Sequence, residues 1–181
     1  MKIAIIGWGS LIWDPRELPR EGTWQDDGPE LKIEFSRISK DARLTLVLDV
    51  ANGTPVKTKY VMSPRTSLDD AIEDLREREG KVGKCIGWVD IVKNTSSANC
   101  THKQVAEWCR DKGFDAAIWT DLPPNFEKET KKPFSVDNAI IYLKSLPKNV
   151  RKEALKYIRN APECVKTSLR EEVNKIDFLI K

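Results

Sequence analysis

The fold begins with residues 2–11, which read Lys2-Ile3-Ala4-Ile5-Ile6-Gly7-Trp8-Gly9-Ser10-Leu11. The apolar run at residues 3–6 has the length of a buried strand, and a glycine ends it. Gly7 and Gly9 flank a single residue, so the backbone can turn sharply and approach a ligand without clashes from Cβ atoms. Successive amides in such a turn can form a nest for an anion, and Ser10 adds a hydroxyl group. The segment predicts a strand that opens into a carboxylate- or phosphate-binding loop, or else a tight turn without a ligand.

Further strands are expected at residues 31–38, 43–49, 56–62, 84–92 and 114–120. In the second of these, Leu44, Leu46 and Leu48 share one face, which is typical of a half-buried strand. Asn52-Gly53 is a strong hairpin signal between residues 43–49 and 56–62. The short spacing of the three strands within residues 31–62 favours an antiparallel meander or a small barrel.

Helices are expected at residues 64–79 and 101–113 and through most of the chain after residue 135. Ser67, Thr101, Ser135 and Ser168 stand where N-caps are expected, and glycines end the first two helices. No repeat and no linker-like tract divides the sequence. We therefore predict a single α+β domain over residues 1–181, a small mixed β-barrel or sheet with flanking helices and a helical C-terminal extension from about residue 135.

One acidic residue falls on the apolar side of the first long helix. The apolar stripe of this helix carries Leu68, Ile72 and Leu75. At about 100° per residue, Glu79 lies within about 40° of each of them, whereas Glu77 faces solvent. A carboxylate in that place should be paired, protonated or ready to transfer a proton, because burying an unpaired charge is costly. A general base with a raised pKa fits this pattern, and so does an ion pair with a neighbouring arginine or fraying of the last helical turn.

The composition is that of an ordinary globular protein without a strong charge bias. Its 31 basic and 28 acidic residues leave a net charge of +3, which argues against a dedicated nucleic-acid binder. No apolar run approaches the roughly 18 to 20 residues of a membrane span. The four cysteines include no CxxC pair, so we expect reduced thiols in a cytoplasmic protein. Cys100, His102 and Cys109 match no common zinc spacing, and neither a metal nor a cofactor is predicted.

Two of these segments, taken together, resemble one known family. Residues 7–13, Gly7-Trp8-Gly9-Ser10-Leu11-Ile12-Trp13, resemble the G-Y-G-S-L loop of the γ-glutamylcyclotransferases, particularly of the glutathione-specific branch, which often continues with I-W. Residues 75–80, Leu75-Arg76-Glu77-Arg78-Glu79-Gly80, resemble the L-x-x-R/Q-E-G/K end of that family's catalytic helix. The hairpin at residues 52–56 resembles the family's G-x-x-V hairpin. The resemblance covers roughly residues 3–92 and implies a γ-glutamylcyclotransferase-like fold with a cleft beside the first loop.

The resemblance also implies a reaction. In that family the loop amides grip the carboxylate of a γ-glutamyl group, and the glutamate accepts a proton from the substrate's α-amino group. The freed amine closes on the γ-carbonyl, and 5-oxoproline is released. Carried over residue by residue, Glu79 would be the catalytic acid/base, and the substrate would be bound by Gly7, Trp8, Gly9, Ser10 and Leu11.

This sequence departs from the family pattern at two aromatic positions. Trp8 replaces the usual loop tyrosine, and Ile86 stands where many members carry a tyrosine beyond the catalytic glutamate. We further expect Trp13 at the pocket. Arg37, on a strand beside it, would bind a substrate carboxylate, pair with Glu79 or form a surface salt bridge.

The sequence therefore predicts an intramolecular acyl-transfer enzyme, of transferase or lyase type, that acts on a small γ-glutamyl amine or peptide. Such chemistry needs only orientation and one proton shuttle, because the nucleophile is already part of the substrate. Two alternatives stay open: a non-catalytic small-molecule sensor or interaction module on the same fold, and a related amide hydrolase. A dinucleotide-binding loop is not indicated, because the third glycine of that motif would stand at Ile12.

Overall fold

The computed structural model describes residues 1–80, 85–97 and 101–175. The chain packs into two compact units, each made of two segments. Unit 1 contains Met1–Leu31 and Lys57–Leu122, and unit 2 contains Lys32–Val56 and Pro123–Lys181. This division describes internal packing, so a single domain over residues 1–181 stays a prediction.

Unit 1 is built on a six-stranded sheet with the strand order β2-β6-β1-β9-β7-β8. Its strands are β1 (Ile3–Gly7), β2 (Glu21–Gln25), β6 (Lys59–Met62), β7 (Ile86–Asp90), β8 (Thr95–Ser96) and β9 (Ala116–Thr120). The neighbours β1 and β9 are parallel, with Ile3 opposite Ala116 and Ile6 opposite Trp119, and the other pairs are antiparallel. All five residues of β1 are buried, as the apolar run at its start predicts.

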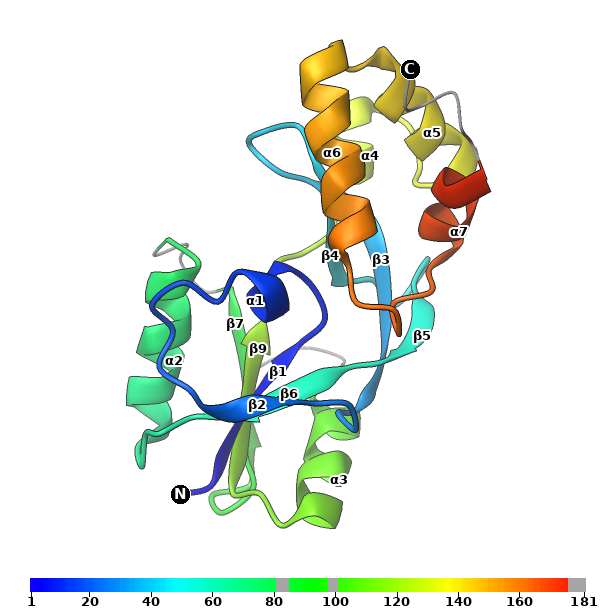
Figure 1. Cartoon of the computed structure of the whole chain (residues 1–181). Coiled ribbons are helices and arrows are strands. Elements are labelled where there is room, and N and C mark those ends of the chain that lie inside the picture. The colour runs from blue at the N-terminus through cyan, green and yellow to red at the C-terminus, as the bar shows by residue number, and fades with distance from the viewer. Residues whose placement is uncertain (81–84, 98–100, 176–181) are drawn as a thin grey trace. The chain divides into compact units, whose positions relative to one another are not determined.

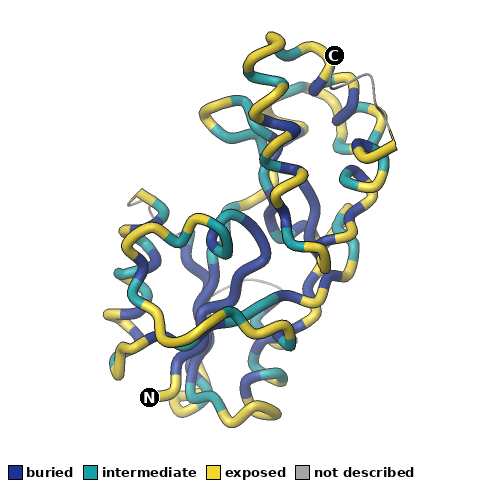
Figure 2. Tube along the Cα trace, viewed as in Figure 1, coloured by how far each residue is buried: buried dark blue, intermediate teal, exposed yellow. Residues whose placement is uncertain are grey.

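Helices cover both faces of the unit 1 sheet (Figure 1). α1 (Ser10–Trp13) and α2 (Leu68–Arg78) lie on one face, where Leu11 and Leu75 join a core cluster with Ile5 of β1. α3 (His102–Lys112) covers the other face and buries Val105 and Cys109. Figure 2 shows the central strands β1 and β9 of unit 1 buried, and β2 and the outer sides of α2 and α3 largely exposed.

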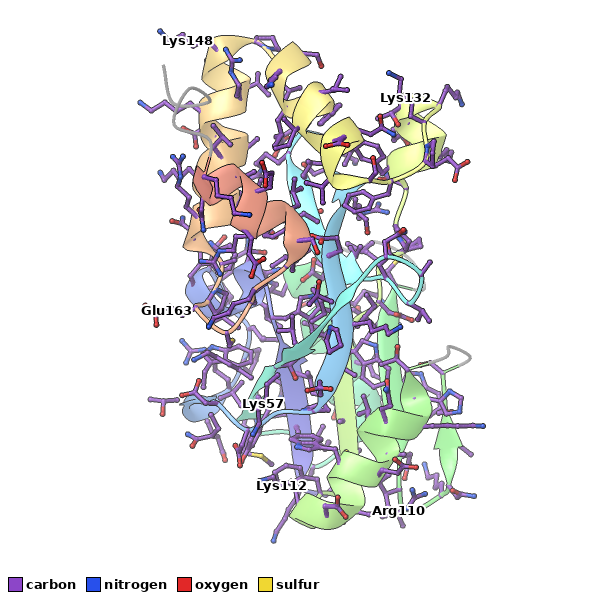
Figure 3. All side chains as sticks on the ribbon, turned by 90° about the vertical axis from the view of Figure 1, so that its right-hand side faces the viewer. Lys57, Arg110, Lys112, Lys132, Lys148 and Glu163 are labelled. Atoms are coloured by element: carbon purple, nitrogen blue, oxygen red, sulfur yellow. The ribbon has the colours of Figure 1, made fainter. Side chains whose placement is uncertain are left out.

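In the described part of unit 2, a three-stranded sheet is combined with four helices. The sheet has the order β4-β3-β5, with β3 (Glu30–Ile38), β4 (Leu44–Leu48) and β5 (Thr54–Lys57). The helices are α4 (Phe126–Thr130), α5 (Val136–Ser145), α6 (Lys148–Asn160) and α7 (Ser168–Lys175), so the predicted helical last third is confirmed. Charged side chains project outward from this unit, such as Lys148 of α6 and Lys132 between α4 and α5 (Figure 3).

The α+β class is confirmed, but the barrel part of the prediction is wrong. The described strands form two separate sheets and no closed barrel. The expected strand at residues 56–62 is divided at Thr58, which is buried and lies between β5 and β6. Both the amide and the hydroxyl of Thr58 donate to the carbonyl of Pro29, at 3.1 and 2.7 Å. β5 lies beside β3 and not beside β4, so the predicted meander and the predicted hairpin at Asn52-Gly53 are also wrong, and β6 pairs with β1 and β2.

The helix caps follow the sequence at two of four places. The hydroxyls of Ser67 and Ser135 accept bonds from amides three residues further on, at 3.5 and 3.1 Å, as predicted. Thr101 is the N-cap residue of α3 but makes no side-chain capping bond. At α7 the capping hydroxyl belongs to Thr167, one residue before the predicted Ser168.

Among the described residues, four short elements, α1, β2, β8 and α4, fall where the sequence analysis expected neither a helix nor a strand. β2 lies within residues 15–29, which are rich in proline, glycine and charge and were not among the expected strands. Cys85, Cys109 and Cys164 are free thiols, as expected, and Cys100 lies outside the described residues. Among the helices that the structure describes, none combines the length and the hydropathy needed to cross a membrane.

Candidate functional site

The carboxyl ends of β1 and β9 meet at one edge of the unit 1 sheet. The strands are parallel, so Gly7 and Thr120 follow the paired residues Ile6 and Trp119 at the same end. Loops that leave parallel strands gather at this edge, which is where open α/β sheets bind ligands. The first loop, residues 7–11, leaves β1 at this edge.

α2 brings Glu79 to the same place. Leu68 and Leu75 of α2 pack in one cluster with Ile118 of β9. Thr120 follows Ile118 on the same face of its strand, and Glu79 follows Leu75 on the same side of its helix. Both apolar rows therefore end in a polar residue, and the Thr120 hydroxyl donates to Glu79 Oε1 at 3.1 Å.

Arg78 links this carboxylate to the first loop. Its Nη1 lies 2.5 Å from Glu79 Oε1, and its Nη2 donates to the Asp14 carbonyl oxygen at 2.5 Å and to Ser10 Oγ at 3.4 Å. The side chain of Arg78 is only 5% exposed, and that of Glu79 is 15% exposed. Four side chains thus form one hydrogen-bonded group, which we call the Glu79 cluster: Ser10, Arg78, Glu79 and Thr120.

The structure bears on the three interpretations of Glu79. The residue is the C-cap of α2, one position beyond the last helical residue, and its carboxylate stays on the apolar side of the helix and does not turn out to solvent. An ion pair with a neighbouring arginine, one of the expected alternatives, is present and involves Arg78. The carboxylate is therefore both shielded and paired.

The first loop is more buried than a freely exposed binding loop. Trp8 and Leu11 are each 5% exposed, so their side chains belong mainly to the interior. A Cβ atom added to Gly7 would lie 2.9 Å from two ring atoms of Trp24, which gives this glycine a packing role. Ser10 is the loop residue whose side chain joins the Glu79 cluster. A substrate-binding role for Gly7, Trp8, Gly9, Ser10 and Leu11 stays a prediction.

The remaining two predicted site residues lie in different parts of the chain. Trp13 ends α1 in unit 1 and is partly buried. Arg37 lies on β3 of unit 2, where its Nη1 donates to the carbonyl of Pro123 at 2.6 Å. The Glu79 cluster belongs to unit 1, so a partnership of Arg37 with Glu79 or with a bound substrate stays a prediction.

Sequence reasoning missed two contributors to the cluster environment. Thr120 is the one residue with a hydroxyl group in the predicted strand 114–120, and it stands at the end of that strand. Its position could therefore have been recognised from the sequence. Asp14 contributes through its backbone carbonyl, for which the amino-acid type gives no signal. Arg78 was considered only as an ion-pair partner, yet it also connects α2 to the first loop.

A cysteine nucleophile and a metal site are less well supported by the described residues. Burial raises the pKa of the Cys109 thiol to about 12, so this thiol is a poor nucleophile near neutral pH. Within the part of the chain that the structure describes, no three His, Cys, Asp or Glu side chains are grouped to hold a metal ion.

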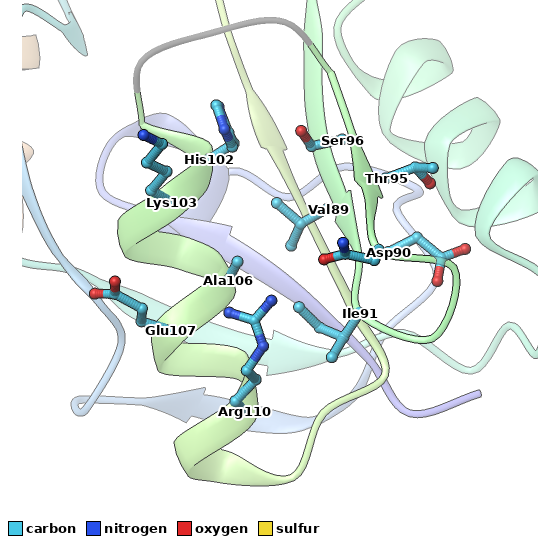
Figure 4. Close-up of a pocket in the computed structure, with 11 residues that line it drawn as sticks. Val89, Asp90, Ile91, Thr95, Ser96, His102, Lys103, Ala106, Glu107 and Arg110 are labelled. Atoms are coloured by element: carbon cyan, nitrogen blue, oxygen red, sulfur yellow. The ribbon is translucent and has the colours of Figure 1, made fainter.

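A separate cavity of about 320 Å³ lies between α3 and the hairpin of β7 and β8 (Figure 4). Arg110 reaches from α3 toward this hairpin, whereas Glu107 points away from it. Asp90, which also lines the cavity, is engaged by the amide and the ammonium group of Lys93. Lining groups of both charges select no ligand class, and no member of the Glu79 cluster lines this cavity.

No protein-family model matches this chain, and no curated protein matches it.

Proposed function

We propose that this protein is a γ-glutamylcyclotransferase-like enzyme, which converts a γ-glutamyl amine or peptide into 5-oxoproline and a free amine. The observation that carries the proposal is the link between Glu79 and the first loop through Arg78. The guanidinium group lies 2.5 Å from Glu79 Oε1 and 3.4 Å from Ser10 Oγ. Two segments that resemble the substrate loop and the catalytic helix end of that family thus share one hydrogen-bonded group, although Ser10 and Arg78 are 68 residues apart.

The proposed reaction needs one proton acceptor and no cofactor. Glu79 takes a proton from the α-ammonium group of the substrate, and the free amine attacks the γ-carbonyl carbon. A new carbon–nitrogen bond closes the five-membered ring, and the original amide bond breaks as the departing nitrogen receives the proton from Glu79. The ring nitrogen then gives its extra proton to Glu79, which passes it to the released amine, so that this product leaves as an ammonium ion. Because nucleophile and electrophile belong to one molecule, orientation supplies a large part of the rate enhancement.

The setting of Glu79 suits this role. A carboxylate that is 15% exposed is shielded from most of the solvent and still accessible on one side. A cationic ammonium group is a favourable partner for it, and the attraction is stronger at a partly buried site than in bulk water.

Replacing Glu79 tests the proposal directly. Glu79→Gln should lower 5-oxoproline release by about 10²- to 10⁴-fold, the usual contribution of a general base. The fold should persist with a lower Tm, because the buried Arg78 guanidinium keeps its bonds to Ser10 and Asp14 but loses its counter-charge. The matched control is Glu77→Gln, which removes an exposed carboxylate from the same helix. Equal turnover by wild type and Glu79→Gln would overturn the proposal.

A second candidate, a binding module without catalysis, is favoured by one observation. The Glu79 carboxylate is already engaged by Arg78, as a purely structural ion pair would be. Incubation of the wild-type protein with a panel of γ-glutamyl amines and dipeptides, followed by mass spectrometry, separates the candidates. Released 5-oxoproline supports the proposed enzyme, free glutamate indicates a hydrolase, and retained but unchanged ligand indicates a binding module.

A further inference from the structure

We propose that Arg78 and Thr120 are positioning residues, which hold the Glu79 carboxylate by Oε1 and leave Oε2 to exchange the proton. The inference rests on the proposed function and assigns the two carboxylate oxygens different tasks. Neither Arg78 nor Thr120 would touch the substrate. Both would act through Glu79.

The hydrogen bonds of Glu79 are unevenly divided between its oxygens. Arg78 Nη1 lies 2.5 Å from Oε1, and the Thr120 hydroxyl donates to the same atom at 3.1 Å. Within residues 1–80, 85–97 and 101–175, no hydrogen bond ends on Oε2. An ionised carboxylate has about four acceptor sites, and the two that are occupied here belong to one oxygen.

Arg78 is a rigid support for this arrangement. Its Nη2 is fixed by the Asp14 carbonyl and Ser10 Oγ, and its own backbone carbonyl accepts a bond from Arg16 Nη1 at 2.9 Å. A planar guanidinium group with donors on both Nη atoms transmits this constraint to its partner, which an ammonium group on a flexible stem would not do. Thr120 is fixed independently, because it ends the central strand β9.

The two donors have a chemical consequence for the proton. A bond from a guanidinium group and a bond from a hydroxyl stabilise negative charge on Oε1 and occupy the directions from which a proton would approach it. Oε2 accepts no hydrogen bond from the described part of the chain, so it is the atom that can accept a proton from a substrate ammonium group. The donors also prevent the carboxyl group from rotating, which keeps Oε2 in one direction during turnover.

Thr120 offers a matched pair of variants. Thr120→Val keeps the shape of the side chain and removes the hydroxyl, whereas Thr120→Ser keeps the hydroxyl. Thr120→Val should lower kcat about tenfold, with a KM within about twofold of wild type, because the lost bond positions the base and does not bind substrate. Thr120→Ser should restore most of kcat. A merely structural role would lower the Tm of Thr120→Val without this kcat pattern.

Arg78→Lys tests the second support. Lysine keeps the positive charge but cannot hold Glu79, Ser10 and the Asp14 carbonyl at once, so kcat should fall by about tenfold or more. Wild-type kcat in both Thr120→Val and Arg78→Lys would overturn the inference while leaving the proposed function intact.

A measurement independent of turnover separates the two ideas. Carbodiimide coupling of an amine to exposed carboxyl groups, mapped by mass spectrometry, reports how freely each carboxyl group reacts. Labelling of Glu79 should rise about threefold or more in Thr120→Val and Arg78→Lys, because the donors on Oε1 are lost. Labelling of the exposed Glu77 should stay constant. Unchanged labelling of Glu79 contradicts the positioning inference, and increased labelling in a protein that releases no 5-oxoproline contradicts the proposed function alone.

Discussion

Gly7→Ala decides whether the first loop needs its glycine for packing. Gly7 is not among the glycines with positive φ, so alanine is compatible with its backbone. The added Cβ atom, however, would lie 2.9 Å from the Cη2 and Cζ3 atoms of Trp24 and 3.3 Å from Ile12 Cγ1. Ordinary van der Waals contacts begin near 3.4 Å, so the Trp24 ring has to move. The ring is partly buried against the core cluster that contains Leu75, which limits this movement.

Two opposing terms set the expected magnitude. Overpacking of a core costs about 1–3 kcal/mol. Alanine also restricts the unfolded chain, which stabilises the folded state by about 0.4–1 kcal/mol at a position with a compatible backbone. The packing term is larger, so Gly7→Ala should lower the stability by about 1–2 kcal/mol. For a chain of this length that corresponds to a Tm lower by about 2–8 °C.

A double-mutant cycle with Trp24→Phe is the appropriate assay. Phenylalanine lacks the two ring atoms that the new Cβ atom would meet. Loss of the indole nitrogen should cost little, because Trp24 Nε1 is buried without a hydrogen-bond partner among the described residues. In urea titrations, Gly7→Ala should cost at least about 1 kcal/mol less in the Trp24→Phe background than in wild type. Equal stability of wild type and Gly7→Ala, or no relief by Trp24→Phe, would refute the reasoning.

Two further predictions concern unit 2. The Arg170 guanidinium group donates to the backbone carbonyls of residues 159, 161, 162 and 165. Arg170→Ala should therefore destabilise the segment after α6 by about 1–3 kcal/mol, measured as faster amide hydrogen exchange in that segment. Arg170→Lys should exchange as fast as Arg170→Ala. Burial raises the pKa of Glu34, whose carboxylate accepts bonds from the amides of Phe35 and Leu169, above its ordinary value of 4.5. The stability that this group contributes is fully present below pH 4.5 and is lost as the pH rises through the raised pKa. The urea concentration at the unfolding midpoint, measured from pH 4.5 upward, should fall with rising pH for the wild type and change less for Glu34→Gln. The same pH dependence in both proteins would contradict the prediction.

The parts of the fold that the sequence predicted are those that depend on local periodicity. β1 is an apolar run ended by a glycine, and α2 has an apolar stripe with a serine at its N-cap. Each of these signals is formed by residues that are neighbours in the sequence, and both elements form where expected. The position of Glu79 on the apolar side of α2 follows from the same periodicity.

The division of the strands between two sheets could not be predicted in this way. It depends on Thr58, whose amide and hydroxyl both donate to a carbonyl 29 residues earlier in the chain. Nothing in residues 56–62 distinguishes a continuous strand from one that is interrupted by such a contact. The alternation of the side chains is compatible with either, so the sequence predicted a meander or a small barrel where two sheets form.

Only one part of the Glu79 cluster could be predicted from local periodicity, because the other part comes from a residue that is distant in the sequence. The sequence places a carboxylate at the end of an apolar row, and the structure adds the Thr120 hydroxyl, 41 residues away, at the end of a second row. Stability alone gives little reason for this arrangement, because replacing a buried ion pair by apolar side chains is often neutral or stabilising. Among the described residues, hydrogen bonds engage only Oε1 of this carboxylate, which is the arrangement that the proposed proton transfer requires. That interpretation requires the variants at Glu79 and Thr120 to change turnover by more than their effects on Tm account for.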